Sequence, residues 1–541
     1  MTRSTPAADV SHSEVLSERL NAIVASGKLS SLRWPDFSNY RKYIQELYEP
    51  LGYTTVWIRN GQPTPQALGL IAALESSQLE GLNPDDYDAS HWTTRLNTLR
   101  TAQGNADAVV SFDVALTVSA MRYISDLHIG RVNPKHFQFG IDIQQKKYNL
   151  PEFLSQEVLT ASNIQTALDE AAPQYKGYRR TKAALQKYRM LAAQAGAMPL
   201  LKAAKTLAPG DAYADTARLA QRLRLTGDLP QDTIANADSG IYDTALTEAV
   251  RHFQLRHGLE ADGKLGKQTL RQLNTPWKDR VIQLEDALER WRWLPPNFPQ
   301  PPVTVNIPEF RLRAFSEKKT VALSMKVVVG KAVRHQTPVF AENMTYIVFR
   351  PYWNVPLSIA RAEIIPALLK DRRYLERKHF EVVDWKDRHV TSGVVSDEVL
   401  AQLRSGKLRV RQKPGLENAL GLVKFMFPNE YNVYLHGTPV PQLFAQSRRD
   451  FSHGCVRVEK PVELAVWLLR DQPPWTPGKI EAAMESGPDN QHVMLAKPVP
   501  VLIVYLTAVV EEDNQVYFFD DIYGHDRSLN AVLAKGRPYP K

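Results

Sequence analysis

The sequence predicts a multidomain α+β protein: an α-helical scaffold, a small three-helix module and a mostly-β domain that carries an inserted cap. Apolar residues recur at helical spacing up to about residue 205 and again between residues 211 and 276. Beyond a helix and proline-rich linker at residues 277–302, apolar residues alternate with a period of two, as in β-strands. The chain, at 541 residues, is also too long for one hydrophobic core.

The first predicted domain, residues 1–210, is helical. Within residues 112–127, five apolar side chains recur every three or four positions and predict one buried helix face: Val114, Val118, Met121, Ile124 and Leu127. Residues 164–195 follow a similar pattern, and Gly130 to Pro134 interrupts it. No cluster of reactive side chains occurs here, so we interpret this domain as a scaffold.

The second predicted domain, residues 211–276, is a compact module. Leu246, Ala249, Val250 and Phe253 lie on one face of a short helix. Gly258 follows as a cap, and a turn and a second short helix lead to Asn274. The module resembles the peptidoglycan-binding type 1 family in Leu219 to Leu223, Gly240 to Asp243, Ala249-Val250, Phe253-Gln254, His257 to Leu259, Asp262-Gly263, Gly266, Thr269 and Leu273-Asn274. A helical spacer that binds nothing is the alternative interpretation.

The third predicted domain, residues 303–541, is mostly β. Val303, Val305 and Ile307 alternate with polar residues, and further strand candidates occur at residues 327–329, 346–349 and 433–435. Residues 371–413 are dense in charge and contain a predicted helix at 396–404. An insertion of this length between strands is either a lid over a site or a surface decoration without function.

Charge and cysteine content restrict the partners. The balance of 67 basic against 58 acidic residues gives a net charge of +9, which suits an anionic partner or is simply a solvated surface. We expect no nucleic acid, because the chain lacks paired zinc-ligand spacings and a polybasic arm. Cys455 is the single cysteine, so an internal disulfide is excluded.

The start of the sequence has no secretory apolar segment. The longest apolar stretch, from Val499 to Val510, is shorter than the roughly 20 residues that span a membrane. The polar residues that follow Met1 look like a trimmed terminus, which leaves a preceding signal or anchor open.

The candidate chemistry centres on Cys455. A lone cysteine is usually a buried, inert side chain, but Cys455 lies in a polar turn after Gly454, with His453 and His436 nearby in the sequence. A thiol with a pKa near 8.5 needs a neighbouring base to attack a carbonyl near neutral pH. Backbone N–H groups of Gly454 and Cys455 would form an oxyanion hole. From the residues alone, either histidine could be the base.

The same segment resembles the YkuD-type L,D-transpeptidases. In this family a histidine precedes Ser/Thr-His-Gly-Cys, and here His436 precedes Ser452-His453-Gly454-Cys455 with 15 residues between. Many members have asparagine two residues after the cysteine, whereas this chain has Arg457, and one common subgroup of the family also has arginine there. The order of domains is similar to the large YcbB-like members of Gram-negative bacteria. Family-like blocks also occur at Val329 to Lys331, Thr337-Pro338, Pro351 to Ile359, Pro414-Gly415 and Asn418 to Gly421.

This resemblance implies roles for the site residues. Cys455 is the nucleophile that attacks a peptidoglycan stem peptide, releases the terminal D-alanine and forms a thioester. A second stem then attacks this thioester, which gives a 3→3 cross-link. His436 is the base, oriented by the Gly437 carbonyl, and Gly454 and Cys455 form the oxyanion hole. The residues implied to contact substrate are His453, Ser452, Arg457 and Tyr434.

The resemblance also implies the partners and the cellular role. It implies no cofactor and no metal, inhibition by β-lactams of the carbapenem class, other wall-synthesis enzymes as partners, and a role in cell-wall biogenesis and cell shape. It further implies a periplasmic location, with an inner-membrane anchor in a segment absent from this chain as an open alternative.

Three other functions stay open. An L,D-carboxypeptidase or endopeptidase would use the same dyad but transfer the acyl group to water, whereas the cap favours transpeptidation by excluding water. A wall-binding scaffold with an idle catalytic domain is a second alternative. A papain-like protease is disfavoured because the sequence lacks a Cys-Gly-Ser-Cys-Trp-type signature.

Overall fold

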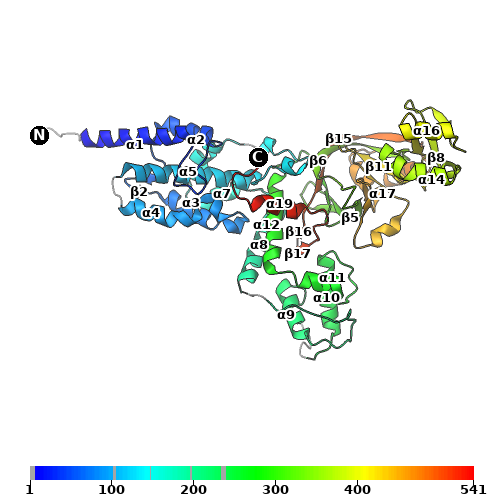
Figure 1. Cartoon of the computed structure of the whole chain (residues 1–541), viewed down its shortest axis with the longest axis horizontal. Helices are drawn as coiled ribbons and strands as arrows, with labels where there is room; N and C mark the ends of the chain where they lie inside the picture. The colour runs from blue at the N-terminus through cyan, green and yellow to red at the C-terminus, as the bar shows by residue number, and fades with distance from the viewer. Residues whose placement is uncertain (1–6, 102–104, 147, 195–197, 233–238, 541) are drawn as a thin grey trace. The chain divides into compact units, whose positions relative to one another are not determined.

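The computed structural model describes residues 7–101, 105–146, 148–194, 198–232 and 239–540. The chain forms two compact units. The first consists of Met1–His257, Ala261–Pro296 and Leu506–Lys541, and the second of Gly258–Glu260 and Asn297–Tyr505. Figure 1 shows the elements of both units, coloured along the chain.

The helical region of the first unit is organised around α5 (Ala106–Ile129), whose residues from Phe112 to Leu127 are all buried. The predicted helix is therefore confirmed, but it is buried on every side instead of along one face. Asp113 is stabilised there by hydrogen bonds from the Tyr48 hydroxyl at 2.6 Å and the Trp57 N–H at 2.8 Å. The other helices, joined by short 3-10 turns and a β1 (Ile58–Arg59)–β2 (Gln62–Pro63) hairpin, are α1 (Ala7–Ser26), α2 (Arg41–Tyr48), α3 (Pro65–Glu75), α4 (Trp92–Thr101), α6 (Leu150–Phe153), α7 (Ile164–Ala171) and α8 (Lys176–Gln194).

Helix α5 has the length and composition of a membrane-spanning helix, with a mean hydropathy of 1.3 over its most apolar stretch. It is the one such helix in the described part of the chain, and 83% of that stretch is buried within the protein. The burial accounts for its apolar composition, because a central core helix has no face exposed to water.

The predicted helix over residues 164–195 is divided. Helix α7 ends at Ala171 and α8 begins at Lys176, with Pro173 between them. Proline has no N–H to donate and disfavours a helical conformation in the residue before it. The apolar spacing continues across the break, which explains why the pattern alone predicted one helix.

The small module contains three helices, α9 (Thr216–Thr226), α10 (Thr244–Arg256) and α11 (Lys267–Leu273). Its own core includes Leu219, Leu246, Val250 and Phe253, the last three of which are among the predicted face of α10. Asp243 caps α10 by accepting a hydrogen bond from the Leu246 N–H at 2.8 Å. The module therefore has the apolar core that a stable three-helix fold requires.

A buried ion pair joins two segments of the module. Arg256 donates from Nε to Asp228 at 2.9 Å, and His252 contacts the same carboxylate at 2.7 Å. Burial raises the pKa of Asp228, but the hydrogen bonds from His252 and Arg256 more than offset that effect and lower it to about 2.

The first unit is completed by α12 (Trp277–Trp293) and by the C-terminal elements β16 (Ala508–Val510), β17 (Val516–Phe518) and α19 (His525–Leu533). Phe518 packs against Tyr188 with ring centroids 5.2 Å apart. The predicted third domain extended to residue 541, whereas the structure assigns Leu506–Lys541 to the first unit. The β-branched residues of β16 and β17 resemble a continuing β domain in sequence, and only their packing partners reveal the difference.

The second unit contains a nine-stranded sheet in the order β13-β5-β14-β12-β11-β6-β15-β3-β4, which closes through a further β4–β5 pairing. Its strands are β3 (Val303–Asn306), β4 (Arg311–Phe315), β5 (Val321–Gly330), β6 (Phe340–Phe349), β11 (Val423–Met426), β12 (Leu435–His436), β13 (Asp450–Ser452), β14 (Val456–Val458) and β15 (Gln491–Val504). Two helices, α17 (Pro461–Leu468) and α18 (Pro477–Glu485), lie between β14 and β15 in the chain. The predicted β character of this region is confirmed.

A second sheet, in the order β7-β10-β8-β9, forms the inserted cap between β6 and β11. Its elements are β7 (Trp353–Asn354), α13 (Leu357–Ile359), the π-helical turn η8 (Ala360–Ile364), α14 (Ile365–Lys370), α15 (Tyr374–Arg377), β8 (Phe380–Val383), β9 (His389–Thr391), α16 (Asp397–Ser405) and β10 (Arg409–Gln412). Its apolar core already includes Val355, Ile364 and Leu368. The cap thus begins near Trp353, earlier than the predicted residue 371, because the two-residue strand β7 is too short to show a period.

Candidate active site

Three neighbouring strands bring the candidate residues to one face of the barrel. Lys424 on β11 is the cross-strand partner of His436 on β12, which is in turn the partner of Arg457 on β14. Because side chains alternate along a strand, partners in register point to the same face. Tyr434 and Cys455, each two residues earlier in its segment, extend this face.

The turn from Ser452 to Cys455 fixes the position of the thiol. The Gly454 N–H donates to Ser452 Oγ at 3.1 Å, and Ser452 Oγ donates to the Cys455 carbonyl at 2.5 Å. Gly454 has φ of +117°, a conformation that glycine adopts without strain. Thr337 ties the turn to β5, because its hydroxyl donates to the Gly454 carbonyl at 2.8 Å and accepts from the Gly330 N–H at 2.9 Å.

The Cys455 thiol is half-buried and lies 3.8 Å from the carbonyl oxygen of Asn432, to which it donates. Burial raises its pKa, while hydrogen bonds from the backbone N–H and hydroxyl of Tyr434 and the charges of Arg457 and Lys424 act in the opposite direction. The protein therefore surrounds the sulfur with donors and cations that stabilise a thiolate once it forms.

His436 is 4% exposed, and its Nδ1 donates to the Gly437 carbonyl at 2.6 Å. Burial and the nearby charge of Arg457 lower its pKa to about 3, although hydrogen bonds to the carbonyls of Gly437 and Leu420 raise it. The imidazole is thus neutral at physiological pH, as a proton acceptor must be.

The resting site holds a neutral thiol and a neutral imidazole. Among the described residues, no hydrogen bond joins Cys455 Sγ to His436. Catalytic hydrogen bonds are often long before substrate binds and tighten in the reactive complex. This arrangement is suited to proton transfer during attack, and it disfavours a permanent thiolate–imidazolium pair.

His453 faces a different partner. Its Nε2 lies 2.8 Å from Glu363 Oε1 on the π-helical turn of the cap, and its ring is 4.9 Å from that of His335. The side chain is partly exposed, whereas Ser452, at 2% exposed, is buried. The geometry therefore favours a link to the cap for His453 and a turn-stabilising role for Ser452, in place of the substrate contact expected for Ser452.

The predicted oxyanion hole is only partly free. The Gly454 N–H is occupied by Ser452 Oγ, while the described residues offer no acceptor to the Cys455 N–H. A donor that already has a partner contributes less to a developing oxyanion. The Cys455 N–H is thus the better candidate of the two.

Sequence reasoning missed Lys424, Glu363 and Asn432. Lys424 left one signal, since it is a charged residue between the buried Val423 and Phe425 of a strand. Glu363 and Asn432 left none, because their proximity to the turn depends on pairings distant in sequence.

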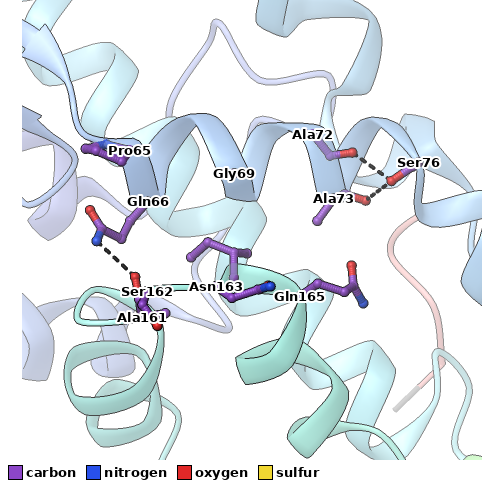
Figure 2. Close-up of a pocket in the computed structure, with 11 residues that line it drawn as sticks. Pro65, Gln66, Gly69, Ala72, Ala73, Ser76, Ala161, Ser162, Asn163 and Gln165 are labelled. Carbon is purple, nitrogen blue, oxygen red and sulfur yellow. Dashed lines mark hydrogen bonds between the residues drawn. The ribbon is translucent and has the colours of Figure 1, made fainter.

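A hollow of about 480 Å³ in the first unit lies between α3 and the beginning of α7 (Figure 2). Gln66 donates to the Ala161 carbonyl across it at 3.0 Å. None of its lining residues is charged: Pro65, Gln66, Gly69, Ala72, Ala73, Ser76, Ala161, Ser162, Asn163, Ile164 and Gln165. We therefore assign it no chemistry.

Comparison with known proteins assigns three segments of the chain. Residues 42–185 match a family described as a scaffold domain, and residues 214–273 match one described as "Putative peptidoglycan binding domain". Residues 301–495 match the YkuD family, described as the L,D-transpeptidase catalytic domain. The order along the chain is therefore scaffold domain, peptidoglycan-binding domain and catalytic domain.

One curated relative is a "Putative L,D-transpeptidase" of Haemophilus influenzae, 32% identical over 230 residues. The match covers 42% of this chain and 45% of the relative, so the chain spans less than half of the relative's length. A crystal structure of an L,D-transpeptidase (Yku) from Stackebrandtia nassauensis is 15% identical with a TM-score of 0.21, and the match covers 57% of this chain and 96% of that one. The chain thus carries a YkuD-type L,D-transpeptidase catalytic domain together with a peptidoglycan-binding type 1 domain.

Proposed function

We propose that the protein is a cysteine L,D-transpeptidase that forms 3→3 cross-links between peptidoglycan stem peptides. The observation that carries this proposal is the shared strand face, on which the hydrogen-bonded Ser452–Cys455 turn presents a thiol close to donors and cations. The buried imidazole of His436, held by the Gly437 carbonyl, supplies a neutral base on that face. The matched catalytic and peptidoglycan-binding domains support the substrate class.

In the first half-reaction, Cys455 Sγ attacks the carbonyl at the L-centre of the diaminopimelate residue while His436 accepts the thiol proton. The Cys455 N–H donates to the oxyanion that develops on this carbonyl. Collapse of the tetrahedral intermediate breaks the peptide C–N bond, and His436 returns the proton to the departing D-alanine amine. A thioester remains on Cys455.

In the second half-reaction, the side-chain amine of an acceptor stem attacks the thioester carbonyl. His436 takes a proton from this amine, the C–S bond breaks, and the proton returns to the sulfur. The product is an amide cross-link between two third-position residues, and the enzyme is regenerated. No metal or cofactor is needed for the balance of either step.

The cap is proposed to cover the donor during this exchange. Glu363 connects it to His453, two residues from the nucleophile, which supports a position near the thiol. A cover that excludes water would protect the thioester from hydrolysis until the acceptor amine arrives. Hydrolysis would instead make the protein an L,D-carboxypeptidase.

The domain order supports two further proposals. A helical scaffold domain and a peptidoglycan-binding domain before the catalytic domain are the organisation expected of the YcbB-like subfamily. The catalytic and peptidoglycan-binding domains both need access to peptidoglycan, so we assign the protein to the periplasm. The binding module would hold the catalytic domain against the wall. The Cys455 thiol would be open to acylation by carbapenems.

The test is incubation of the purified protein with disaccharide-tetrapeptide muropeptides, followed by mass spectrometry. We expect cross-linked dimers with loss of one D-alanine, and their absence with Cys455→Ala. Tripeptides without dimers from the wild-type protein would replace the proposal by the carboxypeptidase. Unchanged tetrapeptides, together with an unmodified Cys455 after carbapenem treatment, would indicate an idle domain.

A further inference from the structure

Two cations on the candidate catalytic face have no anionic partner. Among the described residues, neither Lys424 nor Arg457 forms an ion pair with a carboxylate, and Arg457 Nε is buried without a hydrogen-bond acceptor. Both side chains are half-buried. By contrast Arg411, in the cap of the same unit, is paired with Glu381 at 2.5 Å. Unpaired charges away from bulk water are costly, so such a pair calls for a ligand.

The positions of the two cations define what they can reach. They flank His436 on the strands to either side of it, so their Cα atoms are about 10 Å apart, two strand spacings. Lys424 Nζ lies 5.8 Å from the ring centroid of Tyr434, whose hydroxyl contacts Cys455. Side chains as long as lysine and arginine can converge from this separation on one anion beside the sulfur.

The charge balance during catalysis requires more than the thiolate. When the thiol proton moves to His436, the face holds three positive charges and only one negative charge, on the sulfur or the oxyanion. Burial lowers the pKa of both Lys424 and Arg457, and the Cys455 thiolate acts in the opposite direction. A second anion is needed to neutralise this face, and the donor must bring it.

We propose that Lys424 and Arg457 together bind a free carboxylate of the donor stem peptide and thereby select acidic donors over amidated ones. This inference rests on the proposed function, which supplies the identity of the donor as a stem peptide. The bound carboxylate also screens the two cations from His436, whose acceptance of a proton they oppose. Carboxylate binding therefore favours proton transfer as well as affinity, so both kcat and KM depend on it.

The donor has two carboxylates that share this chemistry, one at the D-centre of diaminopimelate and one on the terminal D-alanine. Three donors distinguish them: the free tetrapeptide and two forms amidated at one position each. Loss of a hydrogen-bonded charge pair should lower kcat/KM for one amide by about 10- to 100-fold. In Lys424→Met and Arg457→Gln this preference should fall to about threefold or less, while Arg457→Lys keeps part of it.

A second measurement is independent of transpeptidation, because Cys455 is the only thiol. Iodoacetate is an anionic alkylating reagent for this thiol, and iodoacetamide is its neutral isostere. The ratio of the two alkylation rates for free cysteine serves as the reference. We expect the acetate-to-acetamide rate ratio to be raised about tenfold or more at Cys455. Both Lys424→Met and Arg457→Gln should lower this ratio, and Lys318→Met in the exposed β4–β5 turn should not.

The outcomes separate the two proposals. A raised alkylation ratio that depends on Lys424 and Arg457, without dimers from any donor, would keep the carboxylate site and overturn the transpeptidase. Dimers from both amidated donors at the wild-type rate, or an alkylation ratio unchanged by both substitutions, would overturn the carboxylate site alone.

Discussion

A charged side chain away from bulk water is paired in the peptidoglycan-binding module, whereas two such side chains are unpaired on the candidate catalytic face, among the residues that the structure describes. In the module, Arg256 is paired with Asp228 and the carboxylate also contacts His252. On the candidate catalytic face, Lys424 and Arg457 lie near a thiol, and neither forms an ion pair with a carboxylate within the described part of the chain. A buried cation that has its anionic partner belongs to the fold, whereas a cation without one can bind an anionic ligand. The contrast distinguishes charged residues that stabilise the fold from charged residues that are available to bind a ligand.

The largest expected effect comes from Cys455→Ala, which tests the catalytic side of this comparison. Removal of the nucleophile should lower transpeptidation and carbapenem acylation by about 10⁴-fold or more. Intact-protein mass spectrometry after carbapenem treatment measures the acylation. Because no other cysteine exists, a residual covalent adduct would contradict the assignment, provided that circular dichroism shows an unchanged fold.

The next largest effect should come from His436→Ala, with His453→Ala as the matched control. We expect His436→Ala to slow acylation at neutral pH by about 10²- to 10⁴-fold, because the thiol loses its base. The rate should recover partly at high pH, as the thiol ionises by itself. A pH profile of acylation gives the result, and recovery seen only in His453→Ala would exchange the two roles.

On the structural side, Asp228→Asn should destabilise the first unit by about 3 to 5 kcal/mol, because it leaves Arg256 buried without its partner. The folded pKa of about 2 lies below the ordinary value of 3.8, so this stabilisation is present above pH 4 and is lost as the pH falls towards 2. Thermal unfolding of both proteins between pH 2 and pH 7 should show the difference shrinking in acid. The exposed Asp232→Asn is the control, and an equal effect of both substitutions would refute the pairing argument.

The smallest effect concerns the cap. Gln412 and Trp353 are cross-strand partners, so the two ends of the cap lie one strand spacing apart and a short Gly/Ser linker can replace residues 353–412. We expect the ratio of cross-linked dimer to hydrolysed tripeptide to fall severalfold, since water then reaches the thioester. Chromatography of the products measures the ratio. A folded deletion variant with an unchanged ratio would show that the cap is a decoration.

The sequence predicted the local features of the molecule better than the long-range ones. The helix face around Val250 and the Ser452–Cys455 turn depend on residues close in sequence, so spacing and motif sufficed for them. The pairing of Lys424 with His436 is a cross-strand register that no local pattern specifies. The cap's start at β7 and the packing of β16 and β17 in the first unit were missed for the same reason.

The internal hydrogen bonds of Ser452 illustrate a further limit. A serine next to a reactive residue suggests contact with substrate, but its hydroxyl is satisfied within the turn. Only the positions of Gly454 N and the Cys455 carbonyl distinguish a residue that positions the nucleophile from one that meets the ligand.

Because Leu506–Lys541 belongs to the first unit, the main segment of the second unit, from Asn297 to Tyr505, is an insertion within the first. During synthesis the ribosome must therefore complete the whole catalytic barrel before the first unit can acquire its last elements. The Tyr539 hydroxyl, which donates to the buried Asp86 at 2.6 Å, joins residues made at nearly opposite ends of translation. The inserted barrel is continuous in sequence and can fold as soon as it emerges. Translation order thus favours a finished barrel while the first unit is still incomplete, so that the unit bearing the thiol can mature before the unit whose sequence encloses it.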